Sequence, residues 1–306
     1  MTAYLLRRLA SGAGVIVGLI IFAFFASHYI GDPVNLLVDR EFSTDEDRAR
    51  LMEAGGFNRP VQEQFMDFAG GAIRGDFGNS IWQNRPASRV VIERLPATAL
   101  LAAAGLAFTA LLAVPAALIA GKYAGRWPDS LISGLATASA STASFWWALV
   151  LIMIFAVRLG VLPTSGYGSW RNLILPVVAL TPGAIGRITQ VLQTSIRTEM
   201  RRAYVSTARA KGLAERTVLL RHVLRNSALI GVTLFGAELI GLLNGVVLVE
   251  SIFAWPGIGQ VALQAVQKRD LPVLLASVFY VGVVVTLLNL LVDLAYVTLD
   301  PRVRLK

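Results

Sequence analysis

The chain has 306 residues, of which 55% are hydrophobic and only 15% are charged. This balance argues against a soluble enzyme or a soluble binding module, because soluble domains seldom combine so little charge with so much aliphatic side chain. The formal charge of +9 is typical of basic loops facing anionic lipid, and no nucleic-acid partner is expected because no basic groove with interleaved aromatic residues is present.

Six stretches are long and apolar enough to cross a bilayer. A hydrocarbon layer of about 30 Å requires roughly 20 apolar residues in a helix, and backbone groups in lipid must bond internally. The stretches are residues 9–30, 98–120, 131–157, 173–191, 228–249 and 274–299. A single such stretch is compatible with a buried core helix, but six predict an all-α membrane protein with six transmembrane helices.

The first stretch follows Arg7 and Arg8, which is also typical of a secretory signal peptide. Its apolar run is longer than a usual signal core, and no Ala-x-Ala cleavage site follows Phe25. We therefore expect residues 1–30 to form an uncleaved first transmembrane helix.

Residues 31–97 form a long polar segment between the first two predicted spans. Residues 43–54 begin with Ser and Thr, then acids, then arginines, which predicts a helix start. Residues 60–78 predict a second short amphipathic helix that stops at the glycine pair 70–71. We expect an extracytoplasmic segment with short helices, followed by a five-helix membrane core at residues 98–306.

Lysine and arginine in the short loops predict the orientation, because cytoplasmic loops carry the excess of positive charge. One set of helix ends carries Arg7, Arg8, Lys122, Arg126, the run from Arg197 to Arg225, Arg302, Arg304 and Lys306. The opposite short loops carry only Arg158, Arg171, Lys268 and Arg269. Both termini and the loop 197–227 are therefore expected in the cytoplasm.

Two groups of polar side chains lie inside the predicted spans, one of hydroxyl-bearing residues and one of a few ionisable residues. Residues 133–144 are rich in Ser, Thr and Ala, which favours either close helix packing or a hydroxyl-bearing wall of a passage that includes Ser139 and Ser141. Ionisable residues inside a membrane are functional candidates by default. They are Arg187, Glu238 and Asp293.

Glu238 lies in the middle of its predicted span, and Asn244 follows within about two turns. Either Glu238 satisfies an interhelical hydrogen bond, or Glu238 and Asn244 belong to a substrate pathway. Arg187 and Asp293 are expected nearer the cytoplasmic ends, where pairing or snorkelling satisfies the charge.

The motifs of common active sites are missing. The sequence has no GxxxxGK[ST] phosphate loop, no HExxH and no GxSxG, so neither ATP hydrolysis nor an intramembrane enzyme is expected. The absence of cysteine excludes thiolate metal sites. The two histidines, His28 and His222, lie on opposite sides of the membrane, so no metal site is predicted.

The densest run of cations is AYVSTARAKGLAERTVLLRHVLRN, residues 203–226. Residues 203–211 predict a short helix, Gly212 permits a left-handed turn, and a second helical segment follows. An interfacial helix on anionic lipid would explain the charge but not the small side chains of Ala208 and Ala210, which suit a groove in another protein. The chain has no ATP site, yet it is expected to expose such a helix to the cytoplasm. This combination indicates that a separate ATP-hydrolysing protein drives it.

This run resembles the EAA loop of permease subunits of binding-protein-dependent ABC importers, in the oligopeptide, dipeptide and nickel branch. Six further segments are similar to that family and occur in the same order. They are GDPVNLL (31–37), GDFGNSIWQNRP (75–86), ERLPAT (93–98), LPTSGY (162–167), VESIFAWPGIGQ (249–260) and NLLVDLAYVTLDPRVR (289–304).

The resemblance implies the type I ABC importer permease fold in a bacterial-type cytoplasmic membrane. It implies a second homologous permease, two ATP-binding cassette subunits that use ATP and Mg, and an extracytoplasmic substrate-binding protein; the chain itself would hold no cofactor. The cargo would be peptides or similar small solutes. The coupling residues would be Tyr204, Thr207, Ala208, Arg209, Ala210, Lys211, Gly212 and Leu213.

Two departures from the family pattern bear on this expectation. Ser206 stands where the family has its name-giving glutamate, and Leu229-Ile230 replaces the usual Leu-Pro after Arg-Asn. The alternative function is a stand-alone secondary transporter, which would predict internal repeats and more buried charges than this sequence has.

Overall fold

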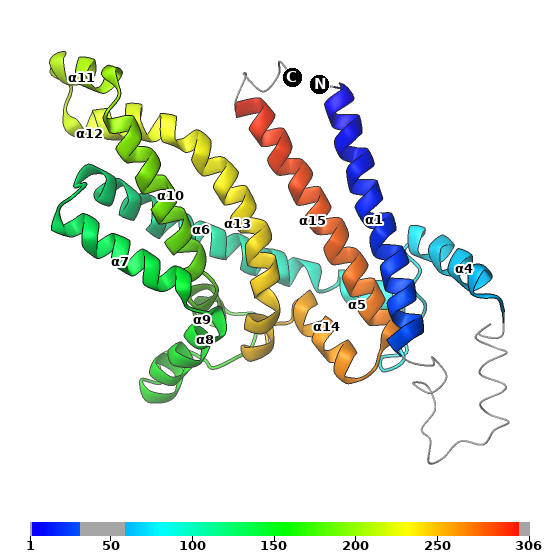
Figure 1. The fold of residues 1–306 in the computed structure, drawn as a ribbon. Coiled ribbons are helices and arrows are strands. Elements are labelled where there is room, and N and C mark those ends of the chain that lie inside the picture. Colours follow the sequence, from blue (N-terminus) through cyan, green and yellow to red (C-terminus); the bar gives the residue numbers. More distant parts are fainter. Residues whose placement is uncertain (1, 31–58, 300–306) are drawn as a thin grey trace. The chain divides into compact units, whose positions relative to one another are not determined.

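A computed structural model gives the structure of residues 2–30 and 59–299, with side chains described at 10–25, 59–227, 231, 233–243 and 245–294. Helices dominate these residues (Figure 1), and an isolated β-bridge pairs Asn79 with Pro86. The chain divides into two compact units, residues 1–96 with 257–287 and residues 97–256 with 288–306. The helix predicted at residues 43–54 lies outside the described residues.

The first unit is built from α1 (Thr2–Ile30), α4 (Val61–Ile73), α5 (Ala87–Ile92), α14 (Ile258–Gln267) and the first part of α15 (Leu271–Leu299). Aromatic rings pack α4 against α1: the centroid of Phe24 lies 5.3 Å from that of Phe65 and 5.7 Å from that of Phe68. Such apolar burial holds the short external helix on the long one.

The prediction that α4 stops at the glycine pair 70–71 is wrong, because the helix continues to Ile73. Gly71 has another use. A Cβ atom at this position would lie 2.8 Å from the carbonyl oxygen of Asp76, so the glycine allows the following loop to approach the helix closely.

The second unit contains the remaining helices. They are α6 (Leu95–Lys122), α7 (Trp127–Ser141), α8 (Ser144–Leu151), η1 (Ile152–Arg158), α9 (Trp170–Leu180), α10 (Pro182–Met200), α11 (Ala203–Ala210), α12 (Glu215–Thr217), η2 (Val218–Val223) and α13 (Leu224–Ile252). Helices α7 and α10 run side by side (Figure 1). Gly186 permits this close approach, because a Cβ atom there would collide with the carbonyl of Ala136 and the hydroxyl of Ser139.

Two stretches of the described chain, Ala87–Lys122 and Leu271–Leu294, are long and apolar enough to cross a membrane, and up to five are if each bent helix pair counts as one span. The bends measure 100° between α7 and α8, 55° between α9 and α10, and 48° within α13. The described part of α1 has a shorter apolar stretch, Ala10–Phe25.

The predicted third span, residues 131–157, is therefore broken. Thr142 and Ala143 are extended at the break. The hydroxyls of Ser141 and Thr142 donate to the carbonyls of Thr137 and Ala138, which is a local pattern that bends helices. In the fourth span the bend lies at Thr181, where the following residue, Pro182, has no N–H to donate to the preceding turn.

Candidate coupling helix and polar wall

The sequence-predicted coupling residues lie on α11 and the turn that follows it. Val205 and Ala208 are buried on the inner face of α11, against a cluster that includes Ile188, Ile196 and Val218. Tyr204 is half-buried, and the exposed members of the set are Thr207, Arg209, Ala210, Lys211, Gly212 and Leu213. The small side chain of Ala208 is thus explained by packing within the chain, whereas that of Ala210 faces outward.

Gly212 ends α11 in a left-handed conformation with φ of +76°. The N–H of Gly212 donates to the carbonyl of Arg209 at 2.9 Å, and the N–H of Leu213 donates to the carbonyl of Ala208 at 3.3 Å. This bond pair is the Schellman motif, which satisfies the last carbonyls of a helix and favours glycine. The turn that the sequence predicted is confirmed.

An ion pair spans this turn. The guanidinium of Arg209 donates to Glu215 through Nη2 at 2.6 Å and through Nε at 3.1 Å. The hydrogen bonds from Arg209 lower the pKa of Glu215 and raise that of the guanidinium. At the base of α11, the hydroxyl of Tyr204 donates to Glu199 at 2.8 Å, and burial raises the pKa of this phenol.

Glu215→Gln is expected to lower stability by less than about 1 kcal/mol, because both partners are exposed. The pKa of Glu215 is depressed in the folded protein, so the contribution of the pair is present above the unfolded-state pKa and is lost as the pH falls. The difference in apparent unfolding midpoint between wild type and E215Q should shrink from neutral pH to pH about 4. Arg216→Gln, which removes an exposed charge next to the pair, is the matched control; a difference that grew on acidification would contradict the assignment.

A buried carboxylate on α7 binds the C-terminal half of α10, the helix that precedes α11. Asp129 accepts hydrogen bonds from the N–H of Gly125 at 2.7 Å, from Ser133, from Gln193 and from Arg197. Its side chain is only 8% exposed. The sequence reasoning missed this network because the predicted span began two residues later, although an aspartate in the first turn after a Trp-Pro pair is a helix-start signal.

Polar side chains form a band on α7 and α10, here called the polar wall, in which all members except the half-buried Gln190 are exposed. Its members are Thr137, Ser141, Arg187, Gln190, Thr194 and Thr198. The amide of Gln190 donates to the hydroxyl of Thr137 at 3.0 Å, which links the two helices. The spacing of 187, 190, 194 and 198 places these residues on one face of α10.

The four residues predicted for the substrate pathway, Ser139, Ser141, Glu238 and Asn244, lie in different environments. Ser141 is exposed on the polar wall, whereas the hydroxyl of Ser139 donates to the carbonyl of Ala136 at the contact with Gly186. Glu238 pairs with Arg187: Nε lies 2.6 Å from Oε1, and Nη2 lies 2.7 Å from Oε2. The side chain of Asn244 lies outside the described residues.

Three of the segments that carry the family resemblance meet in the second unit. The indole N–H of the buried Trp255 donates to the carbonyl of Ala97 at 2.9 Å, and the ring of Tyr167 lies edge-on at 4.9 Å. The fully buried Glu250 accepts a hydrogen bond from the hydroxyl of Thr98 at 2.7 Å. These contacts hold together residues from three segments that are far apart in the sequence.

In the first unit, Asp270 holds the loop that contains GDFGNSIWQNRP. Its carboxylate accepts a hydrogen bond from the hydroxyl of Ser80. It also accepts from the backbone N–H groups of Ile81 and Trp82, both at 3.3 Å. The ammonium of Lys268 lies 3.8 Å from the centre of the Trp82 ring. The loop is thereby fixed to the end of α14.

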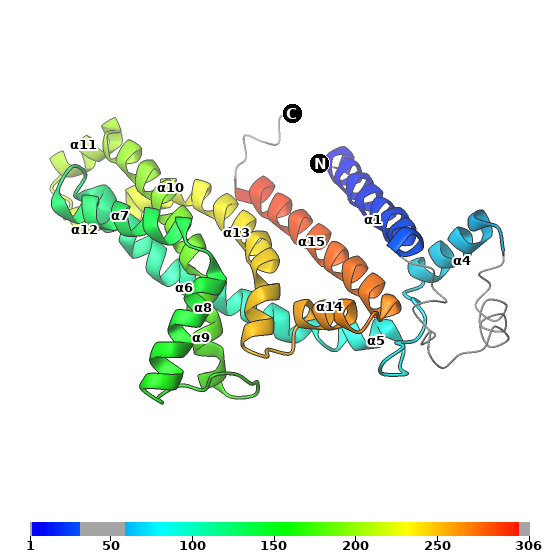
Figure 2. The same ribbon diagram turned by 60° about the horizontal axis from the view of Figure 1, so that its bottom comes forward.

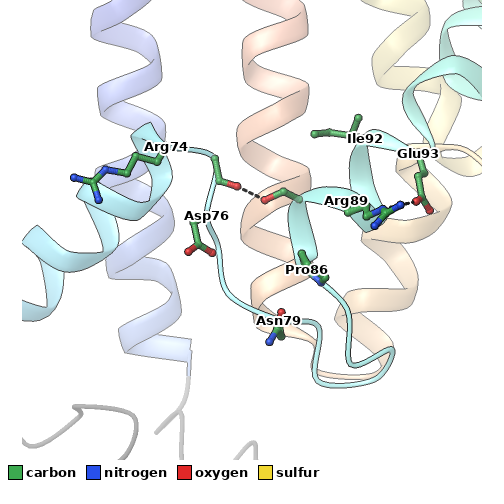
Figure 3. Close-up of a pocket in the computed structure, with 9 residues that line it drawn as sticks. Arg74, Asp76, Asn79, Pro86, Arg89, Ile92 and Glu93 are labelled. Carbon is green, nitrogen blue, oxygen red and sulfur yellow. Dashed lines mark hydrogen bonds and ion pairs between the residues drawn. The ribbon is translucent and has the colours of Figure 1, made fainter.

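An open pocket of about 810 Å³ lies between the end of α4, this loop and α5 (Figure 3). It is lined by Arg74, Gly75, Asp76, Asn79, Pro86, Ser88, Arg89, Ile92 and Glu93. Arg89 pairs with Glu93 at 3.2 Å, so charges of both signs are present. Within the described residues no group of three or more His, Asp or Glu side chains gathers as metal ligands would.

Residues 113–305 match the family model described as "Binding-protein-dependent transport system inner membrane component". The chain is 32% identical to the oligopeptide transport system permease protein AppB of Bacillus subtilis (99% of each chain) and 32% identical to the glutathione transport system permease protein GsiC of Escherichia coli K12 (100% of each).

Among solved structures, an inward-facing structure of the MetNI methionine ABC transporter is similar in fold. The TM-score is 0.59 at 16% identity, over 69% of this chain and 96% of that chain. The similarity supports the arrangement of helices and says nothing of the solute.

Proposed function

The chain belongs to the family of inner membrane components of binding-protein-dependent transport systems, and from this premise we propose how it acts in such a system. It is a membrane-embedded permease subunit of an ATP-driven importer and not itself the ATPase. Full-length relatives that are permeases of oligopeptide and glutathione transport systems favour this function over a stand-alone secondary transporter.

The complete importer would contain this chain, a second homologous permease, two ATP-binding cassette subunits and an extracytoplasmic binding protein. ATP and Mg would be bound by the cassette subunits. We assign six spans in the type I arrangement, both termini in the cytoplasm, and a location in the bacterial-type inner membrane. The cargo is a peptide or a similar small solute, as the names of the relatives suggest.

Helix α11 would be the coupling helix that seats in a cleft of one cassette subunit. This proposal rests on an exposed short helix that follows α10 after two residues and is fixed to it by a shared core. ATP-driven approach of the cassette subunits would move α11, and α10 would move with it. The transported solute can shift this equilibrium only through different contacts in the inward-open and outward-open states.

The polar wall would line the translocation pathway, together with Glu238, which lies behind Arg187. Ser139, two residues from Ser141, and Asn244, six residues from Glu238, would contribute to the same pathway. Polar side chains that face lipid are unfavourable, so an exposed polar face on helices in a membrane is better explained by water or by the second permease. The wall is the single observation that favours a pathway on this side of α10.

Uptake should require the complete importer. In proteoliposomes that contain both permeases and both cassette subunits, a radiolabelled peptide should accumulate only with its loaded binding protein outside and ATP inside. The control is this chain alone with an imposed proton or sodium gradient. Gradient-driven uptake by the single chain would overturn the proposal in favour of a secondary transporter.

A further inference from the structure

An arginine and a glutamate meet between α10 and α13, which run side by side in both views (Figures 1 and 2). Their two parallel hydrogen bonds, at 2.6 and 2.7 Å, form a bidentate pair. Glu238 is at the midpoint of α13, whereas Arg187 is in the second turn of α10. The Arg187 side chain is 53% exposed and that of Glu238 only 12%, so the carboxylate lies behind the guanidinium.

A purely structural role does not account for this arrangement. An arginine that faced the centre of the bilayer would cost about 2.5–3.5 kcal/mol on insertion scales. Apolar side chains of similar volume would join the two helices at least as well as an ion pair. The exposure of Arg187, with Gln190 and Thr194 continuing the same face, indicates instead that its outer side meets water, a polar ligand or the second permease.

The free edge of the guanidinium has a defined chemistry. Glu238 accepts from Nε and from one N–H of Nη2, which leaves the second N–H of Nη2 and both N–H groups of Nη1. No other side chain of the described chain accepts a hydrogen bond from this edge. The Nη1–Nη2 edge is planar and matches the two oxygens of a second carboxylate.

We infer that Arg187, oriented by Glu238, is a binding point for a carboxylate of the transported solute. The inference rests on the proposed function, because it places the polar wall in the pathway. Glu238 fixes the direction of the guanidinium and offsets its charge, so a bound carboxylate is held weakly enough to leave again, as passage through a pathway requires.

The electrostatic part of the inference can be tested with charged thiol reagents, because the chain has no cysteine of its own. In the complete importer, Val191→Cys places a thiol one turn from Arg187, at a position that is 40% exposed. Labelling of this chain by anionic sulfonatoethyl methanethiosulfonate is compared with labelling by the cationic trimethylammonioethyl reagent. The anion-to-cation rate ratio should fall about tenfold with Arg187→Gln and rise with Glu238→Gln.

Thr198→Cys, on the same face about three turns from Arg187, is the matched control, and its ratio should change little. If neither reagent modifies Val191→Cys, the wall is covered and the pathway in the proposed function fails. If both reagents react but Arg187→Gln leaves the anion-to-cation rate ratio unchanged, the proposed pathway stands and the inference about Arg187 fails.

The ligand class is tested with trialanine and its C-terminal amide as protecting agents. Trialanine should slow the labelling of Val191→Cys more than the amide does, and Arg187→Gln should abolish this difference. Arg187→Lys keeps the charge but not the planar edge, so it should retain the reagent ratio and reduce the difference; this variant also covers the case in which Arg187→Gln misfolds. Equal protection by both peptides, or protection by neither, would overturn the assignment.

Discussion

Gly212→Val should uncouple ATP hydrolysis from uptake, with uptake reduced on the order of tenfold or more while hydrolysis continues. The residue has φ of +76°, where an L-side chain costs roughly 1–2 kcal/mol and a β-branched one is a genuine outlier. No atom lies within 4 Å of a Cβ built at this position, so the effect comes from the backbone and not from a collision. The Schellman bonds that fix the end of α11 are then lost.

The experiment compares ATPase activity and peptide uptake in proteoliposomes, with membrane insertion checked by the amount of chain recovered. Gly212→Asn is the matched control, because asparagine tolerates the left-handed conformation and should retain most of the coupling. Normal uptake by Gly212→Val would show that the turn does not transmit the movement.

Trp255→Ala should destabilise the second unit by about 3–5 kcal/mol, the range measured for large aromatic side chains in cores. Trp255 is only 2% exposed, and its loss removes the hydrogen bond to Ala97 together with the ring contact to Tyr167. The apparent unfolding temperature of the purified importer should fall by several degrees, and less chain should accumulate in the membrane.

Trp127→Ala provides the comparison, because this tryptophan is 76% exposed at the start of α7. Its replacement should change the unfolding temperature much less than Trp255→Ala does. Equal effects of the two substitutions would mean that the contacts between residues 97, 167 and 255 do not hold this part of the fold together.

Features set by nearby residues were predictable from the sequence. The turn at Gly212 follows from a short helix, a glycine and a second helix in immediate succession, and the structure confirms it. The helical class follows from apolar length, because lipid leaves the backbone few alternatives. The number of spans and their orientation stay predictions.

Features that depend on distant residues were not predictable. Arg187 and Glu238 are separated by 51 residues, and no sequence pattern indicates that α10 and α13 bring them together. The break after Ser141 was missed because average hydropathy does not register hydroxyl groups that bond to their own helix. The glycine pair in α4 was misassigned because close approach of a loop and helix termination leave the same sequence signal.

The hydrogen bonds of Asp129 bear on how solute binding and ATP-driven movement would be coupled. They join α10 to α7 near the end of α10 that leads into α11, and Arg187 lies on the same helix, three to four turns earlier. In the proposed coupling, a displacement of α11 would move α10 and with it the guanidinium of Arg187. Thermodynamic coupling is reciprocal. A solute that binds more tightly to one orientation of the guanidinium would therefore favour one position of α11, so solute binding and the ATP-driven movement would be linked.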